Sequence, residues 1–215
     1  NPKNSFLADP FVVEHKNKDY IFLEEYNFSK KKGIISVYEN KNNIFKRIGI
    51  ALEENFHLSF PFIFMYENKF YMMPETKESN EIRIYESDNF PMEWKLKKTI
   101  MKSIKAADSM IFEFNNYWWL ITTFSNTEHN TDSELQVFYS LNGPLTDNWI
   151  GFKNNPVIID PDLGRNAGIF FDNNKIYRAS QSYGFNSYGK KINVNEIIKL
   201  APDIYEEKKE RHMDF

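Results

Sequence analysis

Three carboxylates along the 215-residue chain have surroundings that suit acid–base chemistry. Asp9 precedes Pro10 and an apolar run, Glu75 follows an apolar run that ends at Pro74, and Asp108 follows two alanines and precedes a further apolar run. Hydrolysis by general acid–base catalysis needs one carboxylate and one carboxylic acid on either side of the bond that breaks. We therefore predict that Asp9, Glu75 and Asp108 are catalytic. If hydrolysis occurs, Asp9 is the candidate base and Glu75 the candidate acid.

A second group of polar residues could bind a hydroxyl-rich ligand, because carboxylates accept hydrogen bonds, arginines donate them and amides do both. The members of this group are Glu24, Glu25, His57, Arg165, Arg178 and Gln181. Structural roles compete with binding here: Asp9 before a proline can cap a turn, Glu24 and Glu25 can be an exposed pair, and His57 can be a structural histidine. The other histidines are scattered, and no glycine-rich phosphate loop is present. We predict neither a metal site nor a cofactor.

These residues belong to a repeated pattern. Four segments, residues 9–20, 60–71, 108–119 and 166–177, align without gaps and begin about fifty residues apart. The eighth residue after each start is asparagine, and the eleventh is Tyr or Trp. The asparagines are Asn17, Asn68, Asn116 and Asn174.

Each repeat predicts a β-hairpin, with an apolar strand, a polar turn and a returning aromatic strand. The turns are expected at residues 16–17, 67–68, 115–116 and 173–174, because asparagine tolerates the positive φ of a tight hairpin turn. Third strands are expected at residues 34–38, 82–85, 135–139 and 192–197, and fourth strands at 45–48, 94–97 and 149–152. Residues 206–211 could form a short helix but fit a strand or a solvated tail better. Repeats of this length, with up to four strands each, indicate an all-β propeller, whereas a β-sandwich would not repeat its turns at fixed intervals.

A tight two-residue turn fixes which residues lie opposite each other in a hairpin. The first residue of each repeat is then opposite the residue fifteen positions later. The expected pairs are Asp9/Glu24, Phe60/Glu75, Asp108/Thr123 and Asn166/Gln181, and a bulged turn would replace Glu24 by Glu25. Since the first strand of a propeller blade lines the axis, we expect these acids and amides to meet at one mouth of the channel. Phe60 would supply the apolar setting that raises the pKa of Glu75.

The composition narrows the possible partners and setting. There are 27 basic and 30 acidic residues, a net charge of −3, which argues against a nucleic acid partner. No apolar run approaches the length of a membrane span, which takes roughly 18 residues or more. The absence of cysteine excludes disulfides and thiol nucleophiles and favours a reducing compartment, so we expect a cytoplasmic location. Aromatic residues reach 17 %, which suits strands and surfaces that stack sugars.

We expect residues 1–215 to form a single domain that is part of a longer protein, because the chain opens at Asn1 with no initiator Met or signal-peptide pattern.

Several motifs of the chain resemble one known family, the N-terminal domain of plant glucosamine inositolphosphorylceramide transferase. They are residues 6–11 (Phe-Leu-Ala-Asp-Pro-Phe), 57–62 (His-Leu-Ser-Phe-Pro-Phe), 73–76 (Met-Pro-Glu-Thr), 106–108 (Ala-Ala-Asp), 165–168 (Arg-Asn-Ala-Gly) and 177–181 (Tyr-Arg-Ala-Ser-Gln). The resemblance extends to about His212. It implies a fold similar to the five-bladed propellers of glycoside hydrolase families 43 and 32, whose acids lie at the starts of the inner strands. Asp9 matches their base-bearing Asp-Pro pattern, whereas Phe60 stands where an acid would be expected.

Related bacterial domains occur alone or fused to sugar-modifying transferases, so the resemblance implies a covalently linked transferase domain and a carbohydrate or sugar-linked ligand. The expected function is a carbohydrate-recognising or sugar-processing module in glycan biosynthesis. One alternative is an autonomous family-43-type hydrolase, and another is a protein-interaction propeller without sugar chemistry. Acids and amides gathered at one mouth disfavour the last. Because four repeats are visible, a fifth blade would come from residues such as 155–160 and the chain ends, or from sequence upstream.

Overall fold

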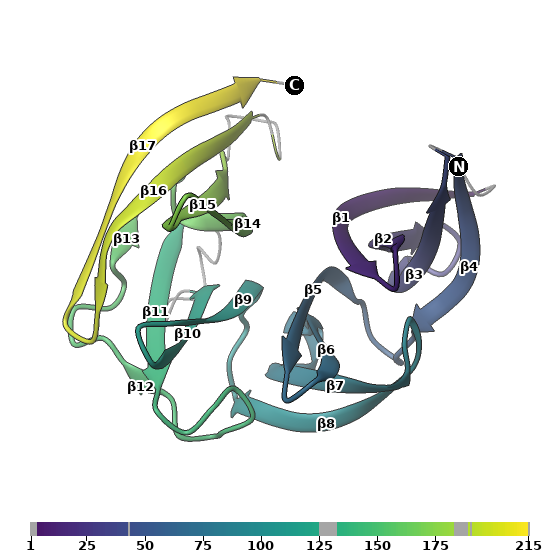
Figure 1. Cartoon of the computed structure of the whole chain (residues 1–215), viewed down its shortest axis with the longest axis horizontal. Helices are drawn as coiled ribbons and strands as arrows, with labels where there is room; N and C mark the ends of the chain where they lie inside the picture. Colours follow the sequence, from purple (N-terminus) through teal and green to yellow (C-terminus); the bar gives the residue numbers. More distant parts are fainter. Residues whose placement is uncertain (1–3, 43, 125–132, 183–188, 190, 215) are drawn as a thin grey trace. The chain divides into compact units, whose positions relative to one another are not determined.

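The computed structural model describes residues 4–42, 44–124, 133–182, 189 and 191–214, and of residues 211–214 it describes the backbone alone. The chain forms two compact units, Asn1–Ile104 and Lys105–Phe215. Each unit contains two antiparallel sheets whose strands follow one another in chain order, as Figure 1 shows. Antiparallel meanders of this kind are the blades of β-propellers. No described residue belongs to a helix long and apolar enough to cross a membrane.

The first unit contains blades 1 and 2. Blade 1 consists of β1 (Ser5–His15), β2 (Lys18–Asn27), β3 (Lys32–Lys41) and β4 (Ile44–Leu52). Blade 2 consists of β5 (Ser59–Tyr66), β6 (Lys69–Glu75), β7 (Glu81–Asn89) and β8 (Met92–Lys102), with a 3₁₀ turn η1 (Lys77–Ser79) between β6 and β7. The order of strands within each blade is that expected from the sequence.

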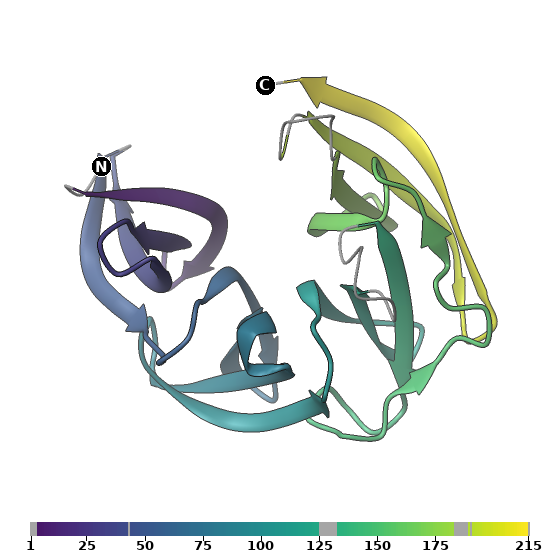
Figure 2. The ribbon, with the colours of Figure 1, turned by 180° about the vertical axis from the view of Figure 1, so that it is seen from behind.

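The second unit contains blades 3 and 4. Blade 3 consists of β9 (Ala107–Phe114), β10 (Tyr117–Thr123), β11 (Glu134–Ser140) and the two short strands β12 (Ile150–Gly151) and β13 (Ile158–Ile159). Blade 4 consists of β14 (Arg165–Asp172), β15 (Lys175–Gln181), β16 (Lys191–Ala201) and β17 (Ile204–Asp214). Figure 2 shows from behind that the two yellow strands, β16 and β17, run side by side, and residues 206–211 are therefore strand rather than helix.

The four predicted turns are confirmed. In each repeat both turn residues have positive φ, for example 52° at Lys16 and 58° at Asn17. The residues that flank this turn, His15 and Lys18, lie opposite each other, as do the equivalent residues in the other repeats. Two consecutive positive φ angles define a type I′ turn, whose twist matches that of the strands it joins.

Each unit has its own apolar core. The core of the first unit contains buried side chains of both its blades: Tyr20, Phe22, Ile35, Val37, Ala51, Leu52, Leu58, Phe70, Met72, Tyr85 and Trp94. The core of the second unit contains Phe112, Trp119, Ile121, Leu135, Val137, Phe152, Ile176, Ile197 and Leu200. Much of the aromatic content therefore packs between sheets, where each buried large apolar side chain contributes about 1.5–3 kcal/mol.

The proposed use of residues 155–160 in a fifth blade is wrong. Ile158 and Ile159 form β13, which pairs with the first two residues of β11, Leu135 and Glu134, within blade 3. The Asn155 side chain holds the segment there, since its amide donates to the Val137 carbonyl over 2.8 Å and its carbonyl accepts from the Val137 N–H over 2.9 Å. Blade 3 thus uses two short strands where the other blades use one long outer strand.

Candidate functional site

A β-bulge interrupts the first strand of every blade near the start of the repeat. In blades 1 to 3 the first residue of the repeat has a left-handed backbone: φ is 49° at Asp9, 45° at Phe60 and 47° at Asp108. Aspartate tolerates this conformation, but it is a genuine outlier for a bulky residue such as phenylalanine. Bulges often lie beside active sites because they redirect a side chain.

The bulges make the four predicted cross-strand pairs wrong by one residue. In each blade the residue on the second strand pairs one position earlier on the first strand than expected. The observed pairs are Glu24 with Ala8, Glu75 with Ser59, Thr123 with Ala107, and Gln181 with Arg165. The bulged-turn alternative is also wrong, because Glu25 lies opposite Leu7. Pro10 and Pro61 were the available signal, since proline cannot donate to a sheet ladder and occurs at bulges.

In the first unit, the carboxylate of Asp9 connects the inner strands of blades 1 and 2. Its Oδ2 accepts a hydrogen bond of 3.2 Å from the backbone N–H of Phe60, at the bulge of β5. The Phe60 ring packs edge-on against Phe11, with ring centroids 4.9 Å apart. Asp9 is half-buried, and its carboxylate is positioned by the second blade.

Glu75 is half-buried at the end of β6, and the residue opposite it is Ser59. The prediction that Phe60 lies opposite Glu75 is therefore wrong, and the apolar setting that Phe60 was expected to give Glu75 stays a prediction. Asp9 and Glu75 nevertheless flank the same bulge of β5, since one contacts Phe60 and the other pairs with the residue before it.

Glu24 and His57 form a second feature of the first unit. The Nδ1 atom of His57 accepts a hydrogen bond of 2.9 Å from the Gly33 N–H, so the neutral ring carries its proton on Nε2. That Nε2 lies 3.5 Å from Oε1 of the buried Glu24. Burial lowers the pKa of His57, and the nearby Glu78, which accepts from the His57 backbone N–H, opposes this shift. Glu24 therefore faces a neutral N–H donor.

Gly33 permits this arrangement and was not singled out from the sequence. A Cβ at Gly33 would lie 2.4 Å from the Leu58 carbonyl oxygen, 2.8 Å from Cε1 of His57 and 2.9 Å from Oε1 of Glu24. The Leu58 N–H also donates to the Gly33 carbonyl over 3.1 Å. The available signal was a lone glycine at the start of a predicted strand, which often marks a close backbone approach.

The lowered pKa of His57 predicts a pH dependence of stability. Because the pKa of His57 is lower in the folded chain, the unfolded chain binds a proton at this residue more readily than the folded chain does. This group therefore lowers the free energy of unfolding as the pH falls below 6.5, its ordinary pKa. We expect His57→Gln to lack this part of the pH dependence. Urea unfolding of both proteins at about pH 7.5 and about pH 5.5 measures it. A stability difference between them that is the same at both pH values would contradict the prediction.

Glu25 does not share the site of Glu24, because successive side chains of β2 point to opposite faces of the sheet. The Glu25 carboxylate accepts from Nε and Nη2 of Arg47 over 3.0 and 2.9 Å, and from the Ser36 hydroxyl. Glu25 is thus held in an ion pair within blade 1, apart from Glu24, and its ligand-binding role stays a prediction.

In the second unit, three of the predicted residues come together around Asp108, whose side chain is almost fully buried. Oδ2 of Asp108 accepts from Nε of Arg165 over 2.5 Å and from Nε2 of Gln181 over 2.9 Å. The same Gln181 amide also donates to the Asn166 carbonyl over 2.8 Å. The carboxylate on the bulge of blade 3 is therefore held by the first two strands of blade 4.

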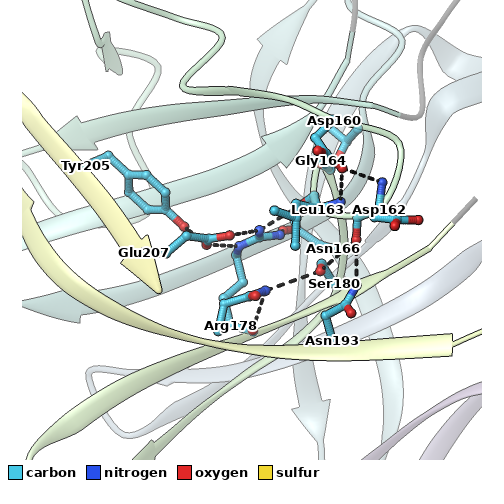
Figure 3. Close-up of polar contacts among 12 residues, drawn as sticks. Asp160, Asp162, Leu163, Gly164, Asn166, Arg178, Ser180, Asn193, Tyr205 and Glu207 are labelled. Atoms are coloured by element: carbon cyan, nitrogen blue, oxygen red, sulfur yellow. Dashed lines mark hydrogen bonds and ion pairs between the residues drawn. The ribbon is translucent and has the colours of Figure 1, made fainter. Parts of the chain in front are cut away.

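Arg178, a predicted ligand-binding residue, has a structural role instead (Figure 3). Its side chain is 0 % exposed, and it forms a two-point ion pair with Glu207, at 2.8 Å from Nε and 2.7 Å from Nη2. Nη2 also donates to the Leu163 carbonyl over 2.7 Å, and Tyr205 donates its hydroxyl hydrogen to Glu207 over 2.6 Å. A guanidinium enclosed in this way cannot reach a ligand.

Arg178 does support the Asp108 cluster through Asn166. Nη1 of Arg178 donates to Oδ1 of Asn166 over 3.2 Å, and Nδ2 of Asn166 donates to the Asp108 carbonyl over 2.8 Å. The Asn166 side chain is fully buried; the sequence placed it opposite Gln181 at the expected channel mouth but did not mark it as a binding residue. Within the described part of the chain, no group of three or more His, Cys, Asp or Glu side chains could hold a metal ion.

Comparison with known families identifies the chain's relatives. A family model described as "Glucosamine inositolphosphorylceramide transferase 1, N-terminal" matches residues 1–213. The chain belongs to this family. Glucosamine inositolphosphorylceramide transferase 1 of Oryza sativa subsp. japonica is 35 % identical over 210 residues, which cover 95 % of this chain and 28 % of the relative. The Arabidopsis thaliana protein of the same name is 36 % identical over 210 residues and is covered to 27 %. This member of the family thus spans little more than a quarter of these relatives.

The fold of this family member is shared with glycoside hydrolases. An exo-β-1,3-galactanase from Clostridium thermocellum superposes with a TM-score of 0.75 at 12 % identity, over 96 % of this chain and 50 % of that one. A family 117 glycoside hydrolase of Zobellia galactanivorans gives a TM-score of 0.70 at 12 % identity, over 96 % and 69 %. At these identities the likeness concerns the fold, which is an all-β propeller.

Proposed function

We propose that this domain binds a carbohydrate or sugar-linked ligand and acts beside a transferase in glycan biosynthesis. One observation carries the proposal. In both units an acid at the bulge of the first blade accepts hydrogen bonds from the second blade, Asp9 from the Phe60 N–H and Asp108 from Arg165 and Gln181. Acceptors fixed in this way, with amide and guanidinium donors beside them, suit the hydroxyl groups of a sugar.

The family and the fold support this proposal. The relatives are named as glucosamine inositolphosphorylceramide transferases, and the propeller fold is shared with enzymes such as an exo-β-1,3-galactanase. Because those relatives are several times longer, we place the transferase activity in a linked region and sugar recognition in this domain. The proposed setting is the cytoplasm, as the lack of cysteine suggests. The two units are proposed to be parts of one five-bladed propeller, with the fifth blade supplied by sequence outside the described strands.

A glycoside hydrolase is the second candidate function. It is favoured by Asp9 and Glu75, which flank one bulge of β5 and could act as base and acid. An inverting hydrolase needs its two carboxyl groups about 6.5–9.5 Å apart, so that water fits between the base and the sugar. A protein-interaction propeller without sugar chemistry is the third candidate.

Calorimetric titration of the domain with a sugar panel tests the proposal. The panel contains glucosamine, N-acetylglucosamine, galactose, arabinose, their short oligosaccharides and their nucleotide-linked forms. We expect at least one to bind, and expect Asp9→Asn to weaken binding about tenfold, because it loses a charged acceptor. Asp108→Asn should weaken binding by a similar factor, because the buried Asp108 carboxylate holds Arg165 and Gln181 in position. Glu14→Gln is the matched control, since Glu14 is an exposed acid on β1 beyond the bulge.

The outcomes separate the three functions. Binding without turnover supports recognition. Turnover that is abolished by Glu75→Gln and by Asp9→Asn, with binding kept by Glu75→Gln, establishes the hydrolase instead. No binding and no turnover with any panel member would overturn both sugar-based functions and leave the protein-interaction propeller.

A further inference from the structure

An aromatic cluster on blade 1 is unusually exposed. Phe6 is 40 % exposed and Phe28 is 53 % exposed. The Phe6 ring stacks on Tyr26 with centroids 5.1 Å apart and planes 22° apart, and Phe28 lies 5.8 Å from Phe6 and 6.0 Å from Tyr26. Phe6 and Tyr26 are cross-strand neighbours, and the Phe28 N–H donates to the Asn4 carbonyl over 3.1 Å. The backbone therefore holds these three rings together. We call Phe6, Tyr26 and Phe28 the aromatic platform.

The platform on blade 1 lies next to Glu24 and His57. Glu24 and Tyr26 are two residues apart on β2, so both side chains are on the same face, about 7 Å apart along the strand. The Tyr26 ring contacts the His57 ring, with centroids 5.8 Å apart, and His57 in turn faces Glu24. A carboxylate, an N–H donor and the platform therefore follow one another on one side of blade 1.

We infer that the aromatic platform is a stacking subsite for a second sugar unit of a ligand whose first unit lies at Glu24 and His57. The inference rests on the proposed carbohydrate-binding function and extends it from a monosaccharide to an oligosaccharide. One face of a pyranose ring presents C–H groups that pack on an aromatic face, while its hydroxyls point outwards and form hydrogen bonds. The exposed rings meet the first need, and the Glu24 carboxylate, which His57 faces from one side, is the acceptor that meets the second.

The surroundings of the platform favour a sugar over a membrane surface. A loop with Phe28 beside Lys30, Lys31 and Lys32 could in principle enter an anionic bilayer. However, Lys30 and Lys32 lie 3.6 and 3.2 Å from the Glu53 carboxylate, which offsets one of the three positive charges and draws both side chains toward Glu53. The platform is also bordered by a hydrogen bond from the Asn4 amide to the Ser29 hydroxyl, a polar rim typical of a sugar subsite.

The test compares chain lengths of one sugar. The probes are N-acetylglucosamine with its β-1,4-linked dimer and trimer, and galactose with its β-1,3-linked dimer and trimer. In calorimetry we expect the dimer of one series to bind the unaltered domain at least tenfold more tightly than the monosaccharide. Phe6→Ala/Phe28→Ala should remove that advantage and leave monosaccharide affinity unchanged. Phe28→Leu, which keeps apolar volume but removes the ring, should remove part of it.

Phe45→Ala is the matched control, because Phe45 is 56 % exposed on β4 and outside the platform. We expect it to bind every probe as the parent does. Dimer affinity that is unaffected in the double variant, while Asp9→Asn still weakens binding, would overturn the subsite alone. The absence of any sugar binding by the parent would overturn the subsite together with the proposed function. Binding to phosphatidylserine vesicles that is lost in Phe28→Ala, with sugar binding intact, would also overturn the subsite and assign the platform to a membrane surface.

Discussion

Replacing Arg178 by Met is expected to lower the free energy of unfolding by about 3–5 kcal/mol, the usual cost of leaving one partner of a buried ion pair without its counter-charge. The Arg178 side chain is 0 % exposed and forms a two-point pair with Glu207. Figure 3 shows the donors around the buried Glu207 carboxylate. Once the guanidinium is removed, the Tyr205 hydroxyl is the one that remains among them. Equilibrium urea unfolding, followed by fluorescence and circular dichroism, measures the loss.

Two further variants separate charge from general disruption. Lys175 is an exposed cation on the same strand, and its Nζ is 3.0 Å from the Glu196 carboxylate. Lys175→Met should lower the free energy of unfolding by less than about 1 kcal/mol. Arg178→Met combined with Glu207→Leu removes both buried charges and should recover part of the lost stability. A cost for Arg178→Met no larger than that for Lys175→Met would contradict the structural role of the pair. Sugar binding should also weaken in Arg178→Met, because Asn166 connects Arg178 to Asp108.

Gly33→Ala is expected to lower the free energy of unfolding by about 3 kcal/mol, at the upper end of the usual range for overpacking. The new methyl group would lie 2.4 Å from the backbone oxygen of Leu58, which cannot move without disturbing the start of blade 2. It would also press on His57 and Glu24, so sugar binding should fall with stability. Thermal unfolding and the calorimetric titration measure the two effects on one preparation.

Gly49→Ala is the control for Gly33→Ala, because both glycines lie in strands of blade 1. The methyl group at Gly49 would meet only the flexible end of Met92, at 3.2 Å. We expect a change within about 0.5 kcal/mol, as for most surface substitutions. Equal losses in the two variants would show that glycine's backbone freedom, rather than the close approach to Leu58, matters at Gly33.

The hairpins were predictable because their cause is local. A turn residue such as Asn17 must adopt positive φ, and asparagine does so readily, so its recurrence marked all four turns. The aromatic strands that follow each turn were equally visible. The sequence therefore carried the blade pattern in short segments, each of which can be read without knowledge of the rest of the chain.

The site was less predictable because its causes are distant in sequence. An arginine such as Arg178 is a residue type that often binds ligands. Its structural role is visible only from its partner Glu207, which lies 29 residues away on β17. Gly33 is explained by the backbone of Leu58, in the segment that leads to the next blade. The bulge at Asp9 moved the cross-strand pairs beyond it, including that of Glu24, by one residue, and a register counted outwards from the turn cannot detect an extra residue.

Domain engineering can use the bulges directly. Asp9, Phe60 and Asp108 share one unusual backbone angle although their side chains differ, so blades 1 to 3 each offer a bulge position whose backbone is the same for an acid and for an aromatic residue. A substitution at such a bulge position changes the side chain without requiring a new loop or a new strand. At Phe60, aspartate or asparagine would also suit the left-handed backbone better than the native phenylalanine does. The propeller thus carries a ready position at which evolution, or a designer, can exchange recognition chemistry one blade at a time.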